Sequence, residues 1–160
     1  MKSSDAVARI PYARFLGVRV EEGPEGIVCV MPFHHDIIGN AALPAIHGGV
    51  VGAFLELTAL LQLFDAGGGD RVARPISFSI DYLRSAGPRD TYGRAEIVKH
   101  GRRIANVRVL AWQDDPAKPV AAGIGPDEPA SDPRLLWEAA GRPLTETEVC
   151  PQRFRAPIAP

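Results

Sequence analysis

The sequence is poor in the features that mark several common protein classes. Only two of its 160 residues are cysteine, which is too few for a disulfide framework and fits a reducing cytoplasm. Lysine and arginine total 18, aspartate and glutamate total 19, and the net charge is −1, so no overall positive field exists to attract nucleic acid. Residues 1–10 contain no apolar run of signal-peptide length. The longest apolar stretch, residues 50–64, is shorter than the roughly 20 residues that cross a bilayer. We therefore expect a cytoplasmic protein that binds neither nucleic acid nor membrane.

Several catalytic motifs are also missing. No G-x-S-x-G elbow is present, which argues against an α/β-hydrolase. The three glycines at 67–69 lack the Lys-Ser/Thr of a phosphate-binding loop. His34 and His35 have no second ligand pair at a zinc-like spacing, and neither Cys29 nor Cys150 belongs to a recognisable nucleophile constellation. We expect no metal and no redox cofactor.

What the sequence does contain is a set of short alternating segments around one long apolar run. Eleven of the fifteen residues at 50–64 are apolar, which predicts a helix that is buried on nearly all sides. The connections between the predicted strands are too short for crossover helices, so neighbouring strands pair antiparallel. A strongly curved antiparallel sheet wrapped around one central helix, an α+β fold, satisfies both observations. The predicted strands span residues 18–20, 27–31, 76–83, 92–100, 102–112 and 119–124.

The composition divides the chain into two parts. Residues 1–125 form one predicted domain, led by a helical segment at 1–16 that Pro11 interrupts. Residues 32–44 between strand and helix are predicted to be irregular. The segment 126–160 begins after the last predicted strand, and seven of the fifteen prolines lie in it. We predict an extended tail there that docks through residues 135–137.

Glu56 breaks the apolar pattern of the central helix. A carboxylate in a buried helix is costly unless it is paired or used, so Glu56 is either a structural ion-pair partner or a catalytic base or nucleophile. His47, Gly48 and Gly49 stand at the start of the same helix, where the first amides lack internal partners and favour a developing oxyanion. The plainer interpretation of these three residues is a tight turn into the helix with an incidental histidine.

The stretch from His47 to Glu56, a His-Gly-Gly followed by an apolar run and an acidic residue, resembles the signature of hotdog-fold acyl-CoA thioesterases. The resemblance is to thioesterases of the PaaI-like, phenylacetyl-CoA and 4-hydroxybenzoyl-CoA type. Residues 10–17 resemble the leading segment of that family, residues 81–86 its "nYLRpa" strand, and residues 98–103 its "GRr" hairpin. The resemblance extends from about Ile10 to Gly125.

The resemblance implies a sheet wrapped around a central helix, with active sites at the subunit boundary of a homodimer or dimer of dimers. It implies hydrolysis of a CoA thioester, with coenzyme A as part of the substrate. The residues to which it assigns roles are Gly49 as the amide that polarises the carbonyl, Glu56 as nucleophile or general base, His47 near the thioester, Asn40 in the preceding loop, and Ser77 as an orienting group for water.

Other site residues follow from their chemistry. Gly48 contributes a second amide to the helix start. Arg102 and Arg103 form a small basic patch that suits the phosphates of coenzyme A, or else a solvated hairpin. We expect an aromatic or medium aliphatic acyl group, in an apolar pocket whose walls include Phe54 and Leu57.

Two other functions are compatible with the sequence. A hotdog dehydratase or hydratase would act on a 3-hydroxyacyl thioester, but the dehydratase type carries a histidine fourteen residues before the helix carboxylate, where Ala42 stands here. A non-catalytic module would bind acyl-CoA without releasing thiol, and the presence of Glu56 speaks against it.

Overall fold

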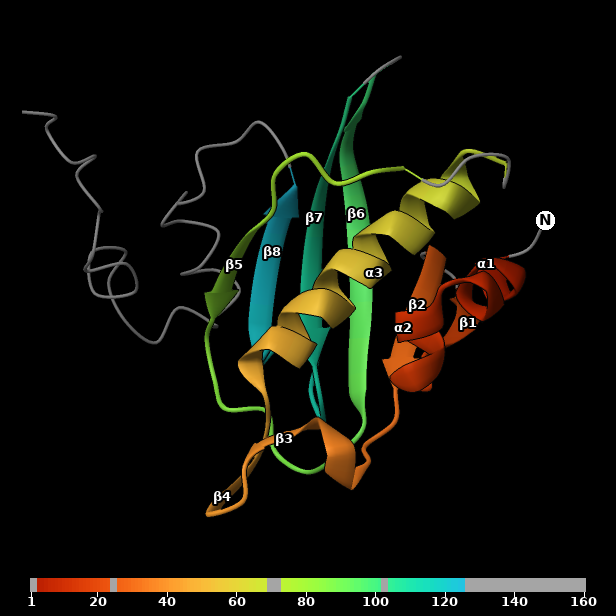
Figure 1. The fold of residues 1–160 in the computed structure, drawn as a ribbon. Helices are drawn as coiled ribbons and strands as arrows, with labels where there is room; N and C mark the ends of the chain where they lie inside the picture. The colour runs from red at the N-terminus through yellow and green to blue at the C-terminus, as the bar shows by residue number, and fades with distance from the viewer. Residues whose placement is uncertain (1–2, 24–25, 69–72, 102–103, 126–160) are drawn as a thin grey trace, which may run out of the picture.

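A computed structural model describes residues 3–23, 26–68, 73–101 and 104–125 of the chain. Its main element is a six-stranded antiparallel sheet in the order β1-β2-β6-β7-β8-β5, with the long helix α3 (Gly48–Ala66) lying across one face (Figure 1). The strands of this sheet are β1 (Arg19–Gly23), β2 (Gly26–Met31), β5 (Ser79–Tyr82), β6 (Thr91–His100), β7 (Ala105–Trp112) and β8 (Ala121–Gly125). The sequence-based prediction of an antiparallel sheet with one central helix is confirmed.

The helix α3 (Gly48–Ala66) is longer at both ends than the predicted segment. It ends where the Gly67 N–H bonds to the Leu63 carbonyl and Gly68 adopts a φ of +75°, as glycine permits at a helix C-terminus. By length and composition α3 could span a membrane, but half of it is buried inside the fold, as expected of a core helix. The residues of α3 that are buried are Val51, Gly52, Phe54, Leu55, Leu57, Thr58, Ala59, Leu61 and Phe64.

One face of α3 is left uncovered, which contradicts the expectation of burial on nearly all sides. Five residues spaced three or four apart lie along one line of the helix, and none of them is buried. We call this line the open stripe; it consists of Gly49, Ala53, Glu56, Leu60 and Leu63. The buried residues Phe54, Thr58 and Leu61 lie on the opposite side of the helix, which packs on the sheet. The sequence correctly indicated an apolar helix, but the sheet of a single chain covers only part of it.

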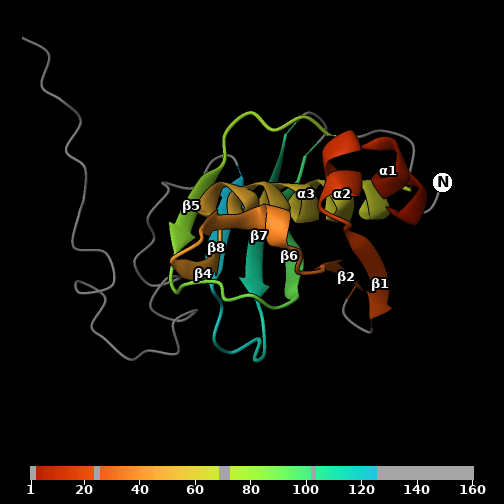
Figure 2. The same cartoon turned by 60° about the horizontal axis from the view of Figure 1, so that its bottom comes forward.

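The N-terminal segment forms two short helices, α1 (Ser3–Arg9) and α2 (Pro11–Phe15). Pro11 occupies the first turn of α2, where a missing N–H costs nothing. Leu16 is fully buried behind them, whereas Phe15 remains 53% exposed. Figures 1 and 2 place both helices near β1 and β2, on the far side of α3 from β5.

Residues 32–44, predicted to be irregular, contain a 3-10 turn η1 (His35–Ile37) and most of a small hairpin of β3 (Ile38–Asn40) and β4 (Leu43–Ile46). The Oδ1 atom of Asn40 accepts the Ala42 N–H at 2.9 Å, which closes the turn between the two strands. The strand predicted at 76–83 is shorter, since β5 begins only at Ser79 and Ile76 is 71% exposed. The predicted tail at 126–160 lies outside the described residues.

Candidate active site at the start of helix α3

The first turn of α3 is capped by a single residue, His47. Its carbonyl oxygen accepts the Val50 and Val51 N–H groups at 2.9 and 3.1 Å, and its Nδ1 atom accepts the Gly49 N–H at 3.0 Å. An atom that accepts an N–H carries a free lone pair, so Nδ1 is unprotonated in this arrangement. The backbone of the β3–β4 hairpin supports the ring, because a Cβ added to Gly39 would stand 2.9 Å from both Cα and Cδ2 of His47.

This capping has a direct consequence for the predicted oxyanion site. The Gly49 N–H is already engaged by His47, so a ligand oxygen can bind it only by displacing the imidazole. The Gly48 N–H, one residue earlier, has no hydrogen-bond acceptor within the described part of the chain. Both glycines are exposed, which leaves room for a ligand to approach their backbone.

Glu56 lies on the open stripe, on the same face of α3 as Gly49 and two turns further along. It is half-buried rather than buried, so the expectation of a carboxylate inside the core is wrong. The two residues are seven positions apart, which places their Cα atoms about 10 Å from each other along the helix axis. Both face away from the sheet of their own chain.

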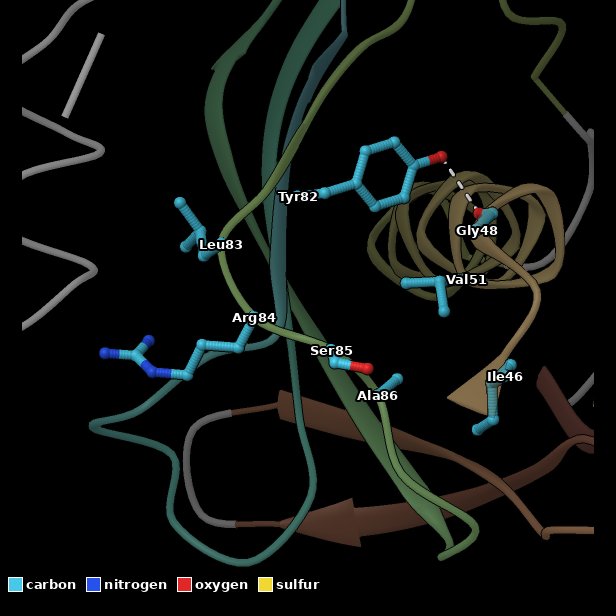
Figure 3. A pocket seen from close by; sticks show the side chains of 8 residues that line it. All are labelled: Ile46, Gly48, Val51, Tyr82, Leu83, Arg84, Ser85 and Ala86. Atoms are coloured by element: carbon cyan, nitrogen blue, oxygen red, sulfur yellow. Dashed lines mark hydrogen bonds between the residues drawn. The ribbon is translucent and has the colours of Figure 1, made fainter. Parts of the chain in front are cut away.

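A pocket of about 420 Å³ opens beside the helix start. Its lining combines the end of β4, the first turns of α3, and the end of β5 with the segment that follows it (Figure 3). These residues are Ile46, Gly48, Val51, Tyr82, Leu83, Arg84, Ser85 and Ala86. The Tyr82 hydroxyl donates to the Gly48 carbonyl at 2.9 Å, while Arg84 points away and donates to the Pro119 carbonyl at 2.9 Å. Sequence reasoning did not select Tyr82, although its alternation with Ile80 could have placed it on the helix-facing side of the strand.

The remaining predicted residues lie in other places. Asn40 is exposed, and its side chain closes the turn of the β3–β4 hairpin. Ser77 is exposed and precedes β5, at the end of that strand opposite to Tyr82. Arg102 and Arg103 lie outside the described residues.

The two predicted pocket walls belong to the core instead. Phe54 is fully buried and Leu57 is 8% exposed, and neither lines the pocket beside the helix start. The ring of Phe54 packs toward β6, where a Cβ on Gly93 would approach it to 2.9 Å. The aliphatic lining comes from Ile46, Val51, Leu83 and Ala86, at positions that the sequence pattern did not distinguish from other apolar residues.

Two further polar groups carry no site chemistry. Cys29 is fully buried, and burial raises the pKa of its thiol to about 12, so it is not a thiolate at neutral pH. His34 and Asp36 lie 3.8 Å apart near the surface. The described residues contain no group of three His, Cys, Asp or Glu side chains that could hold a metal ion.

Comparison with known proteins agrees with this architecture. The thioesterase superfamily matches residues 43–120, from β4 almost to β8. A solved structure of a thioesterase-superfamily protein is 25% identical, with a TM-score of 0.70 over 77% of this chain and 92% of that one. A protein from Chromobacterium violaceum is 33% identical, with a TM-score of 0.62 over 77% of this chain and 85% of its own.

Two weaker similarities complete the comparison. A Bacillus halodurans protein solved with CoA shares the fold at 19% identity, with a TM-score of 0.61 over 75% of this chain and 81% of that one. A curated relative, the ATP-dependent dethiobiotin synthetase BioD of Caulobacter vibrioides, is 53% identical over 47 residues, which is 29% of this chain and 22% of the relative. The chain thus spans only about a fifth of that enzyme.

The sheet order, the central helix and the match across its first turn lead to one assignment: the chain belongs to the thioesterase superfamily and has its hotdog fold.

Proposed function

We propose that the protein is an acyl-CoA thioesterase that hydrolyses a CoA thioester to a free acid and CoA. The observation that carries the proposal is the exposed face of α3, which presents two glycine amides at its start and the carboxylate of Glu56 two turns later. Amides at a helix start stabilise an oxyanion, and a positioned carboxylate supplies a base or nucleophile. The relative that was solved with CoA shares the fold and supports CoA as the carrier of the acyl group.

The separation of these groups favours a site shared between two chains. A base and an oxyanion donor must each lie about 3 Å from the reacting atoms of one thioester. Gly49 and Glu56 of one helix are about 10 Å apart along its axis, and the glutamate side chain shortens this gap by only a few ångströms. In a homodimer whose α3 helices run antiparallel across the open stripes, Gly49 of one subunit approaches Glu56 of the partner subunit.

In the proposed reaction, the helix-start amides and Glu56 have different roles. The thioester carbonyl oxygen binds the helix-start amides, which stabilise the negative charge that develops on it. Glu56 either removes a proton from the attacking water or attacks the carbonyl carbon itself to form a mixed anhydride that water then hydrolyses. In both routes the carbon–sulfur bond breaks and CoA leaves as a thiolate that is then protonated.

His47 must yield its hydrogen bond for this chemistry to begin at Gly49. The carbonyl oxygen of the substrate replaces Nδ1 as the acceptor of the Gly49 N–H, and the released imidazole then lies beside the thioester. The other predicted contacts remain part of the proposal: Arg102 and Arg103 on the phosphates of CoA, and Asn40 and Ser77 near the reacting groups. No metal or redox cofactor takes part in the proposed reaction.

A thiol-release screen against a panel of aromatic and aliphatic acyl-CoA esters tests the proposal. We expect release of free CoA from at least one ester, with a clear preference within the panel. Formation of an enoyl absorbance from a 3-hydroxyacyl-CoA without thiol release would favour the dehydratase instead. Tight binding of acyl-CoA without either product would favour a non-catalytic module, and each of these outcomes would contradict the thioesterase.

A further inference from the structure

Tyr82 connects the edge strand of the sheet to the start of α3. Its hydroxyl donates to the Gly48 carbonyl at 2.9 Å, in the turn that holds both helix-start amides. The ring lies against the small residues of that turn, since a Cβ on Gly48 would stand 3.5 Å from Cε1 and a Cβ on Gly52 3.2 Å from the hydroxyl oxygen. Figure 3 shows the side chain reaching from β5 across to the helix.

The position of this ring is fixed from the sheet side. Tyr82 is the last residue of β5 and pairs with Ala121 of β8. The next two N–H groups, of Leu83 and Arg84, both donate to the Val120 carbonyl at 2.9 and 3.0 Å. The backbone that carries the ring is therefore held by the sheet, and the hydroxyl transmits that position to the helix.

The two glycines at the helix start have few restraints of their own. Gly48 and Gly49 are exposed and have no side chains to pack, and the Gly49 N–H contacts a ring that a substrate must displace. An oxyanion donor works only when it lies about 2.7–3.1 Å from the developing charge, and a misplacement of about 1 Å can cost a hundredfold in rate. A tether on the Gly48 carbonyl restrains the peptide plane that joins these two glycines.

We propose that Tyr82 is a positioning residue for the thioesterase reaction: its hydroxyl holds the first turn of α3 in the geometry that the oxyanion amides need. The exposed face of its ring, in a side chain that is 56% exposed, also forms the outer wall of the pocket beside the helix and limits the size of the acyl group. This inference rests on the proposed thioesterase function. It gives a role to Tyr82, a residue to which the family resemblance assigned none.

The test compares Tyr82→Phe with the matched control Tyr92→Phe. Tyr92 stacks on Trp112 with ring centroids 6.1 Å apart, on the face of the sheet away from α3. In Tyr82→Phe, we expect amide hydrogen exchange at residues 49–52, whose N–H groups have acceptors in this turn, to become about two- to tenfold faster, the effect of one hydrogen bond. We expect kcat to fall roughly ten- to a hundredfold with an unchanged KM, and Tyr92→Phe to change neither quantity.

Tyr82→Ala tests the role of the ring. Removal of the ring opens the pocket wall, so the ratio of kcat/KM for bulky over small acyl-CoA esters should rise relative to Tyr82→Phe. Unchanged exchange in Tyr82→Phe, or faster exchange with an unchanged kcat, overturns the positioning role. A wild-type protein that releases no thiol refutes the proposed function and the catalytic role of Tyr82 with it, whereas the exchange measurement still reports the tether by itself.

Discussion

Glu56 differs from the other long side chains of α3 in being charged, and its half-buried place on the open stripe gives it access to solvent. Glu56→Gln keeps the shape and hydrogen-bonding capacity but removes the charge. We expect turnover to fall roughly 10²- to 10⁴-fold, the contribution of a positioned acid–base group, or further if the carboxylate is the nucleophile. Because an amide is cheaper to bury than a carboxylate, the melting temperature should hold or rise.

The matched control for this variant is Glu96→Gln, an exposed position of β6 on the opposite face of the sheet. It should leave both turnover and melting temperature unchanged. A Glu56→Gln protein that loses stability but keeps its specific activity would identify Glu56 as a structural ion-pair partner.

His47 combines a structural and a chemical role, and two substitutions separate them. His47→Ala removes the cap on the Gly49 N–H and should lower the free energy of unfolding by about 0.5–2 kcal/mol. Asparagine is a good helix cap, so His47→Asn should recover that stability in urea denaturation. If the imidazole also acts at the thioester, His47→Asn stays slow; full recovery of kcat would show that His47 serves only as a cap.

At the scale of elements, α3 packs closely on the sheet at Gly93 of β6. A Cβ on Gly93 of β6 would stand 2.7 Å from Oγ1 of Thr58 and 2.9 Å from the ring of Phe54, and both of these residues are fully buried. Gly93→Ala should therefore lower the free energy of unfolding by about 1–3 kcal/mol through overpacking.

Gly87→Ala is the control for this measurement. The nearest atom to a Cβ there is the end of the Arg89 side chain at 3.4 Å, which can move aside. Urea denaturation should show little change for Gly87→Ala. If both variants lose the same free energy of unfolding, the destabilisation of Gly93→Ala does not come from the contact between α3 and β6.

The same elements show how far the sequence could predict the fold. The apolar run of α3 and its glycine end predicted the helix, and the strands predicted at 92–100 and 102–112 match β6 and β7 to within a few residues. The β3–β4 hairpin was missed because its strands are very short and its turn depends on the side chain of Asn40. An apolar helix pattern also cannot say which neighbours cover each face.

The candidate site also has features that the sequence could predict and features that it could not. The motif places Gly49 and Glu56 on one helix with His47 at its start, and the structure has the same arrangement. It could not reveal that His47 occupies the Gly49 N–H or that Tyr82 reaches the Gly48 carbonyl, because both contacts depend on side-chain orientation, and the second joins residues 34 positions apart in the sequence.

At the scale of the whole molecule, the open stripe and the sheet edge beside the pocket are uncovered in the described chain. The open stripe exposes Leu60 and Leu63 in part, and β5 is an edge strand with a free row of backbone groups. We expect a homodimer, alone or within a dimer of dimers, and sedimentation at micromolar concentration should exclude a stable 17.2 kDa monomer. Leu60→Lys should weaken this association, whereas Val98→Lys, on the exposed end of β6, should not.

A shared site predicts complementation between two inactive variants. Gly49→Pro removes the N–H of the oxyanion site and displaces the imidazole that accepts it, and Glu56→Gln removes the carboxylate. Each homodimer has two damaged sites.

A mixed dimer combines the intact Gly49 of one subunit with the intact Glu56 of its partner at one site, while the other site carries both changes. Random pairing makes half of the dimers mixed, so co-expression should restore about a quarter of wild-type thiol release from a symmetric dimer. If Gly49 and Glu56 of the same chain act together, every site keeps one defect, and the co-expressed mixture stays as inactive as the separate variants.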